Sequence, residues 1–311
     1  MMRYRLIFGT ILILGLIGLI YADDRLAHYA AFWRPATGSS LGLSRCDGFL
    51  ITVVMAAIVV LGTREMHNLL VAAGHHPVPI WPALMNVALV LIPFLAASVS
   101  VGEAGVRDAV ESVSTGTWLT VAFLGSAFLI ARRRTVAGAM GDLAATLLIV
   151  LYLGVLSQYI LRVRLARPDG GAWLLLYFLA TVKVCDMGAF FTGRLIGRRK
   201  LIEWLSPKKT VEGLAGGIIA SVVAAAVIPM AVRRWAPASA AAVLLPQAWE
   251  AALFGLLMAL VGQAGDLFES LIKREAHAKD SADAIPAFGG VLDVLDSPLL
   301  AAPIAYWLLQ V

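Results

Sequence analysis

Acidic side chains near the C-terminus recur at a spacing that could bind a divalent cation together with phosphate. Asp266 and Glu269 are three residues apart, and Asp293 and Asp296 repeat this spacing further along the chain. Residues three apart lie on one face of a helix, so the members of each pair project together. Because a hard cation such as Mg²⁺ takes one or two carboxylates plus phosphate oxygens of a substrate, we expect Asp266 and Asp293 to bind it from neighbouring helices. Glu269, Ser270 and Asp296 would lie beside the metal.

Basic residues follow the first acidic pair and could neutralise phosphate groups. Lys273 is one helical turn beyond Glu269, and Arg274 and Lys279 follow it. The glycine pair at positions 289 and 290 precedes the second acidic pair and predicts a flexible turn in front of those carboxylates. The same residues could instead form a network of salt bridges that closes the ends of a helical bundle.

A serine–proline–lysine–lysine sequence upstream forms a second candidate site. Ser206 and Pro207 are the residue types of a helix N-cap and of the first helical position, so they predict a helix that begins here. Lys208 and Lys209 would then lie in the first turn, where the helix macrodipole disfavours cations. Exposed amides and two ammonium groups would together bind a phosphate at that place. The alternative is a pair of cytoplasmic lysines that follow the positive-inside rule.

A third group of polar residues lies around Asp186, at the end of an apolar run. A carboxylate within hydrocarbon costs about 2.5–3.5 kcal/mol on insertion scales, so Asp186 requires a partner or a polar cavity. Gly193 and Gly197 share its helical face, and glycines there allow another helix or a ligand to approach closely. The alternative is a packing seam of small residues, in which Asp186 pairs with Lys183 or Arg194.

The elements that must position these residues are membrane-spanning helices. Of the 311 residues, 60% are hydrophobic and 14% are charged, and the mean hydropathy is +0.85. A water-soluble protein needs more polar surface, and a transmembrane barrel would alternate polar and apolar residues. We therefore expect an all-α, polytopic integral membrane helical bundle with about nine transmembrane helices. The expected spans are 6–21, 47–62, 80–98, 117–131, 138–160, 172–192, 214–232, 240–262 and 295–311.

The distribution of positive charge favours a cytoplasmic N-terminus. In that orientation the cytoplasmic segments contain fifteen Lys and Arg residues and the opposite side contains nine. All three polar groups then face the cytoplasm. The net charge of +5 follows from this bias and from contact with an anionic lipid bilayer, so we expect no nucleic-acid partner. We expect residues 1–170 to form a scaffold of transmembrane helices and residues 171–311 to form a catalytic transmembrane region with cytoplasmic loops.

The three groups, in this order, resemble the integral-membrane phosphatidate cytidylyltransferases, also called CDP-diacylglycerol synthases. The signature of that family is similar to S-x-x-K-R-x4-K-D followed by a glycine pair, L-D and a further Asp. The matching residues are Ser270, Lys273, Arg274, Lys279, Asp280, Gly289, Gly290, Leu292, Asp293 and Asp296. Upstream matches are Asp186, Gly188, Gly193, Arg194 and Gly197, and then Ser206, Pro207, Lys208, Lys209, Thr210, Glu212 and Gly213.

The resemblance implies that CTP and phosphatidic acid react, with Mg²⁺ as cofactor, to give CDP-diacylglycerol and pyrophosphate. It implies an enzyme of the bacterial inner (plasma) membrane, a homodimer, whose active site faces the cytoplasm. The catalytic residues would be Asp266, Lys273, Asp280, Asp293 and Asp296, with Asp266 and Asp293 as the metal ligands. The substrate-binding residues would be Asp186, Arg194, Ser206, Lys208, Lys209, Thr210, Glu212, Ser270, Arg274, Lys279, Gly289 and Gly290.

Two departures from the family pattern keep other functions open. Phe288 and Val294 stand where the family often has His and Arg. They leave open a CTP-dependent enzyme that acts on another lipid acceptor, and a catalytically inactive branch of the family. An ion-coupled transporter is an alternative from another class, since intramembrane acids also mark ion pathways. The N-terminal half, however, has no matching interrupted helices of the kind that inverted repeats require.

Overall fold

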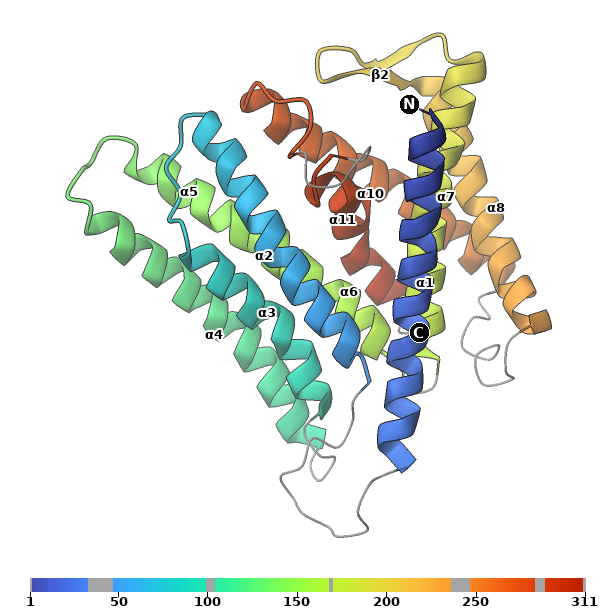
Figure 1. The fold of residues 1–311 in the computed structure, drawn as a ribbon, viewed down its shortest axis with the longest axis horizontal. Coiled ribbons are helices and arrows are strands. Elements are labelled where there is room, and N and C mark those ends of the chain that lie inside the picture. Colours follow the sequence, from blue (N-terminus) through green and yellow to red (C-terminus); the bar gives the residue numbers. More distant parts are fainter. Residues whose placement is uncertain are drawn as a thin grey trace. The chain divides into compact units, whose positions relative to one another are not determined.

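The described residues of the protein form long helices and one short β-hairpin (Figure 1). The structure, a computed structural model, describes residues 2–32, 47–98, 104–167, 170–235, 247–282 and 289–309. The helices are α1 (Met2–Phe32), α2 (Phe49–Ala72), α3 (Trp81–Ser98), α4 (Ala104–Ala131), α5 (Ala139–Ile149), the π-helix η1 (Val150–Val155), α6 (Leu156–Leu165), α7 (Gly171–Ile196), α8 (Val211–Trp235), α10 (Ala248–Glu275) and α11 (Leu292–Leu309). The strands are β1 (Lys200–Ile202) and β2 (Ser206–Thr210).

The helices confirm the expected all-α membrane class. Among the described residues, seven helices are long and apolar enough to cross a membrane, with α5, η1 and α6 counted as one. A helix satisfies its backbone hydrogen bonds internally, as hydrocarbon requires, so apolar runs of this length form helices. The other two expected spans fall on α1 and on α4, where the apolar stretch Thr115–Ala131 is shorter. Parts of the expected spans 240–262 and 295–311 lie outside the described residues.

The chain divides into two compact units. One comprises Met1–Leu165 together with Ala276–Leu292, and the other comprises Ala166–Glu275 together with Asp293–Val311. The expected boundary at residue 170 lies near the first crossing between the units. The segment Ala276–Leu292, which we placed with the C-terminal region, is grouped with the N-terminal helices instead.

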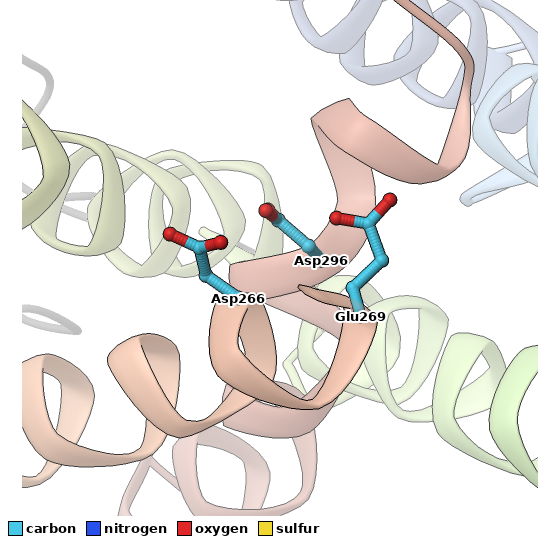
Figure 2. A group of neighbouring side chains, drawn as sticks. All are labelled: Asp266, Glu269 and Asp296. Atoms are coloured by element: carbon cyan, nitrogen blue, oxygen red, sulfur yellow. The ribbon is translucent and has the colours of Figure 1, made fainter. Parts of the chain in front are cut away.

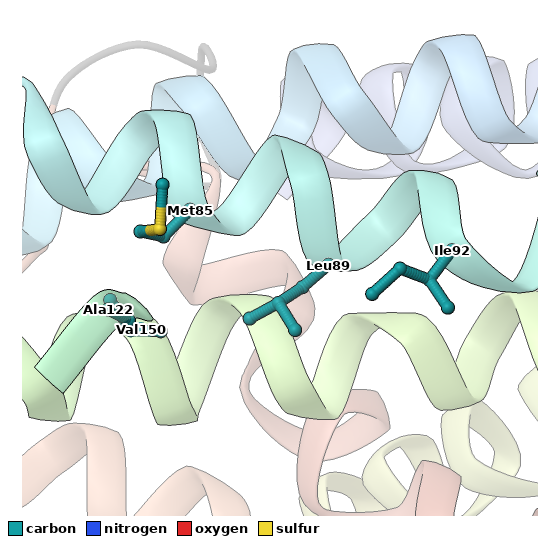
Figure 3. Packing of buried hydrophobic residues seen from close by; sticks show 5 residues of the cluster. All are labelled: Met85, Leu89, Ile92, Ala122 and Val150. Carbon is teal, nitrogen blue, oxygen red and sulfur yellow. The ribbon is translucent and has the colours of Figure 1, made fainter. Parts of the chain in front are cut away.

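The core of the first unit is formed by α3 with its neighbours (Figure 3). Met85, Leu89 and Ile92 recur along one face of α3, and they pack with Ala122 of α4 and Val150 of η1. All five side chains are at most 5% exposed. This periodic apolar face holds α3 between α4 and the helix that contains η1.

The π-helical turn η1 interrupts an otherwise regular α-helix where α3 crosses it. A Cβ atom on Gly154 would lie 2.5 Å from Oδ1 of Asn86, so this position has no room for a side chain. The Asn86 amide donates hydrogen bonds to Oγ1 of Thr63 (2.8 Å) and to the carbonyl oxygen of Ile149 (3.4 Å). A buried amide needs such partners, and the carbonyl group directly before η1 provides one of them.

A buried ion pair joins α1, α2 and α6 in the first unit. Arg164 and Asp23 are fully buried, and Nη2 of Arg164 lies 2.9 Å from Oδ2 of Asp23. The same carboxylate accepts hydrogen bonds from the N–H groups of Gly48 (3.1 Å) and Leu50 (2.9 Å). These N–H groups lie at the start of α2, so Asp23 caps this helix from α1.

A seam of glycines joins α7 to α8 in the second unit. A Cβ atom on Gly188 would lie 2.5 Å from the Cβ atom of Ala220 and 3.1 Å from the carbonyl oxygen of Gly216. A Cβ atom on Gly193, five residues further along α7, would lie 3.0 Å from Oγ1 of Thr210 and 3.5 Å from the Cα atom of Gly213. The sequence-based packing seam is confirmed, and it brings the two backbones close together.

Substitution of Gly188 tests this seam. We expect Gly188→Ala to lower the free energy of unfolding by about 1–3 kcal/mol, because the added methyl group would force the two helices apart. Thermal unfolding of the detergent-solubilised protein measures the change. Gly18→Ala in α1 is the control, since outside its own helical turn no atom lies within 4 Å of the Cβ atom that it would add. Equal melting temperatures of the two variants would contradict a close-packed seam.

The segment after α7 forms an antiparallel hairpin from β1 and β2. The paired residues are Lys200 with Thr210 and Ile202 with Ser206. Arg274 of α10 donates from Nε to the carbonyl oxygen of Leu205 in the turn (3.3 Å). This contact fixes the tip of the hairpin against α10.

The prediction that Ser206 and Pro207 begin a helix is wrong. Helix α8 begins at Val211, and Oγ1 of Thr210 accepts the N–H group of Gly213 (3.1 Å), so Thr210 is the N-cap. The strand pairing with β1 overrides the local helix-start preference, and a proline is tolerated in an edge strand. Lys208 and Lys209 therefore extend from strand β2 and not from the first turn of a helix.

Candidate active site

Three carboxylates from α10 and α11 converge in the second unit (Figure 2). Asp266 and Glu269 extend from α10, and Asp296 extends from α11. One carboxylate oxygen of each lies within 4.8 Å of those of the other two. We call these three residues the acidic cluster. Like charges at this separation repel one another, so the arrangement favours a bound cation.

Small residues allow α10 and α11 to cross at this point. A Cβ atom on Gly265 would overlap the carbonyl oxygen of Asp296, and one on Gly262 would lie 3.7 Å from the Cβ atom of Ser297. Glycine at position 265 therefore permits the backbone of α11 to lie directly against α10. This contact brings Asp296 beside Asp266 and Glu269, which both follow Gly265 on α10.

Glu269 has an unsatisfied carboxylate oxygen. The residue is 1% exposed, and Oε2 accepts a hydrogen bond from Nζ of Lys273 (2.9 Å). Oε1 has no hydrogen-bond partner in the described part of the chain. A buried acceptor without a partner is costly, and a metal ion would satisfy it. Three carboxylates with one unused oxygen fit a hard divalent cation such as Mg²⁺.

Lys273 links the acidic cluster to Asp293. Its Nζ lies 2.6 Å from Oδ1 of Asp293 and 2.9 Å from Oε2 of Glu269, and its side chain is 11% exposed. The structure thus groups Asp266 with Glu269 and Asp296, whereas Asp293 is joined to them through a lysine. The assignment of Asp266 and Asp293 as the metal ligands stays a prediction.

Asp186 of α7 is held beside the acidic cluster by polar contacts. It lies 3.2 Å from Nζ of Lys183, which confirms the predicted pairing. Oδ1 also accepts hydrogen bonds from Nε2 of Gln263 (3.4 Å) and Oγ of Ser297 (3.5 Å). Sequence reasoning missed Gln263, although it lies three residues before Asp266 on the same helical face.

The two adjacent lysines of β2 have different surroundings. Nζ of Lys209 lies 2.8 Å from Oδ2 of Asp266 and 3.5 Å from the carbonyl oxygen of Gln263. Lys208, the preceding residue of the strand, is exposed. Alternation along the strand therefore directs one lysine to the acidic cluster and the other to the surface.

Three more of the predicted substrate-binding residues lie on α7, α8 and α10, and one of them, Glu212, binds the segment before the hairpin. Glu212 accepts hydrogen bonds from the N–H groups of Arg198 (2.9 Å) and Arg199 (3.1 Å), which precede β1. Arg194 is in the last turn of α7. Ser270 directly follows Glu269 on α10 and is half-buried. Their roles in substrate binding stay predictions.

The remaining predicted residues belong to the first unit. They are Lys279, Asp280, Gly289 and Gly290. Lys279 and Asp280 are exposed, and Gly289 has a φ of +95°, which confirms the expected turn. Phe288 lies outside the described residues, and Val294 is half-buried in the first turn of α11.

Comparison with known proteins identifies the family. The model of the cytidylyltransferase family matches residues 36–311. The chain belongs to this family. It is therefore a nucleotidyltransferase, and the resemblance inferred from the sequence is confirmed. Family membership also supports an enzyme over the transporter alternative.

Curated relatives of this cytidylyltransferase come from several bacteria. A phosphatidate cytidylyltransferase of Chlamydia pneumoniae is 30% identical over 272 residues, which cover 85% of this chain and 83% of that protein. One from Synechocystis is 31% identical over 287 residues, with 84% of this chain and 88% of that protein covered. One from Bacillus subtilis is 35% identical over 162 residues, and the match spans 56% of its length.

Proposed function

We propose that the protein is a phosphatidate cytidylyltransferase, which transfers CMP from CTP to the phosphate of phosphatidic acid. The observation that carries this assignment is the acidic cluster with Lys209 beside it, in a membrane protein of the cytidylyltransferase family. The names of the relatives supply the lipid acceptor.

The reaction needs charge neutralisation more than proton transfer. An oxygen of the lipid phosphate forms a bond to the α-phosphorus of CTP, and the bond from that phosphorus to the bridging oxygen of the β-phosphate breaks, releasing pyrophosphate. The attacking phosphate is already an anion near neutral pH, so the site requires no strong general base. Catalysis then depends on positioning and on the stabilisation of negative charge.

The acidic cluster would hold Mg²⁺, which neutralises charge on the nucleotide phosphates when it is bound. Asp266, Glu269 and Asp296 would provide the carboxylates for it. Lys273 keeps Glu269 and Asp293 in a fixed arrangement, because its ammonium group lies within 3 Å of both. Lys209, which pairs with Asp266, would bind a phosphate group of the nucleotide.

We also propose that the site faces the cytoplasm of a bacterial cell, at the depth of the lipid headgroups. CTP is cytosolic and the phosphate of phosphatidic acid lies at the membrane interface. The positive-inside bias of the sequence supports the same orientation. A homodimer, which the family resemblance implies, belongs to this proposal as well.

The two neighbouring lysines provide a paired prediction. We expect Lys209→Met to lower kcat/KM for CTP about 10–100-fold, since it removes a charged donor beside the acidic cluster. Lys208→Met removes the same charge from an exposed position, so its effect should remain below about fivefold. Steady-state rates at varied CTP concentrations measure both. Equal losses in the two variants would show that the strand does not distinguish the lysines.

The proposed function is tested with purified protein, labelled CTP and Mg²⁺. Incorporation of the label into chloroform-extractable lipid is compared with phosphatidic acid, polyprenol and polyprenyl phosphate as acceptors. We expect CDP-diacylglycerol from phosphatidic acid, and no product after chelation of the metal with EDTA. Product with a polyprenyl acceptor alone would identify a CTP-dependent enzyme for another lipid. No lipid product from folded protein would contradict the assignment and favour an inactive branch.

A further inference from the structure

Glu65 is a buried carboxylate that accepts hydrogen bonds from a distant part of the chain. It lies within α2 and is 7% exposed. Oε1 accepts the N–H group of Val291 (2.9 Å), and Oε2 accepts the N–H group of Leu292 (3.0 Å) and the hydroxyl of Ser281 (3.1 Å). No lysine or arginine of the described ranges pairs with it. All of these residues belong to the first unit.

These contacts give α11 an N-terminal cap from another helix. The first N–H groups of a helix have no intrahelical acceptor, and a side chain at the N-cap usually accepts one of them. Val291, directly before α11, has an apolar side chain, and the carboxylate of Asp293 in the first turn is paired with Lys273. Glu65 therefore takes the place of a local cap, and its negative charge is favourable at a helix N-terminus.

The chain around the Glu65 carboxylate is closely packed. A Cβ atom on Gly290 would overlap both Oγ of Ser281 and Oε2 of Glu65, so only glycine fits there. Ser281 and Val291 are ten residues apart in the sequence, and one carboxylate accepts a hydrogen bond from each. The start of α11 is thus fixed by a single side chain of α2.

We propose that Glu65 is a positioning residue for the transfer reaction. It holds the first residues of α11, the helix on which Asp293 and Asp296 follow within the next turn. A displacement of that turn would move both acids, and a misplacement of about 1 Å can reduce a rate about 100-fold. The proposal rests on the proposed function, although Glu65 itself touches no reacting group.

The test combines kinetics with hydrogen exchange on the full-length protein. Glu65→Gln keeps the shape of the side chain. Its NH₂ group, however, would face the N–H group of either Val291 or Leu292, and two donors cannot form a hydrogen bond with each other. We expect kcat to fall about tenfold or more, and amides in a peptide spanning residues 289–297 to exchange about tenfold faster. Ser281→Ala removes one of three hydrogen bonds and should give a smaller change of the same kind.

Asp142→Asn is the matched control. Asp142 is a carboxylate of the same unit, 9% exposed, that accepts the N–H group of His76 (2.7 Å) and pairs with Arg133 (3.0 Å). We expect this variant to keep kcat and the exchange of residues 289–297 within about twofold. Gly290→Ala crowds the Glu65 carboxylate without changing its charge, and it should reproduce the effects of Glu65→Gln.

Two results would overturn the proposal. One is unchanged exchange of residues 289–297 in Glu65→Gln. The other is a kcat per folded molecule equal to that of Asp142→Asn, with only a lowered melting temperature, which indicates a purely structural role. Absence of CDP-diacylglycerol from the unaltered protein would contradict the proposed function instead, whereas the exchange of residues 289–297 would still test the cap.

Discussion

Replacement of Asp266 by Asn should reduce kcat about 100- to 1000-fold in a protein that remains folded. Asp266 is the member of the acidic cluster that also pairs with Lys209, and its side chain is 31% exposed. On the proposed function, loss of its charge would remove a ligand of Mg²⁺ and also the partner of Lys209. Because the position is partly exposed, we expect the folded state to accommodate the amide.

A second measurement distinguishes a metal ligand from a general requirement for charge. An ion that binds only the folded protein raises the melting temperature of that protein as the concentration of the ion increases. Mg²⁺ should therefore raise the melting temperature of the unaltered protein more than that of Asp266→Asn. Glu250→Gln is the control on the same helix, since it retains an oxygen that can accept the N–H group of Gln247. Equal stabilisation of Asp266→Asn and Glu250→Gln by Mg²⁺ would exclude Asp266 as a ligand.

Replacement of Lys273 by Met should affect stability as well as activity. Lys273 is 11% exposed and lies between Glu269 and Asp293, so its removal leaves two carboxylates without their shared cation. Loss of one partner from a buried ion pair costs about 3–5 kcal/mol. We expect a lower melting temperature in detergent and no detectable transfer.

A double variant separates these two effects. Lys273→Met combined with Glu269→Gln has one buried charge fewer, so part of the lost stability should return while activity stays absent. Lys200→Met, at the exposed first residue of β1, is the control, with an expected change in stability within about 0.5 kcal/mol. A double variant no more stable than Lys273→Met would contradict the bridging role of the lysine.

Hydropathy predicted the helices well because each span is apolar around its whole circumference. The expected spans coincide with α2, α3 and α7 to within a few residues at most ends, since hydrocarbon burial selects continuous apolar runs. The C-terminal end of α2 was the exception. The expected span ended at residue 62, whereas the helix continues to Ala72 and includes Glu65.

The error at α2 has a physical cause. Arg64 and Glu65 end the apolar run, although Met66, Leu69 and Leu70 continue a helical period beyond them and are buried. An acid that is satisfied by a segment more than two hundred residues away has no local signal in the sequence. The role of Glu65 could therefore not be predicted, whereas the continuation of the helix could.

The sequence predicted which residues make up the candidate site better than it predicted which of them contact one another. Helical spacing correctly indicated that Asp266 and Glu269 share one face, and that Asp293 and Asp296 lie within one turn. The contact between Lys273 and Asp293, however, depends on how α10 and α11 cross, and this crossing is set by Gly265 against Asp296. The spacing of residues along one helix does not determine which residues of two crossing helices contact each other.

The π-helical turn η1 determines where the continuous helix of α5, η1 and α6 can lose one residue without turning the residues that follow. A π turn closes hydrogen bonds over one more residue than an α turn, so η1 accommodates an additional residue locally. Deletion of one residue within Val150–Val155 would restore a regular α-helix and leave Arg164 facing Asp23. Deletion within α6 would instead turn Arg164 by about 100° around the helix axis. In an alignment of related chains, a single-residue gap in this helix therefore belongs in η1.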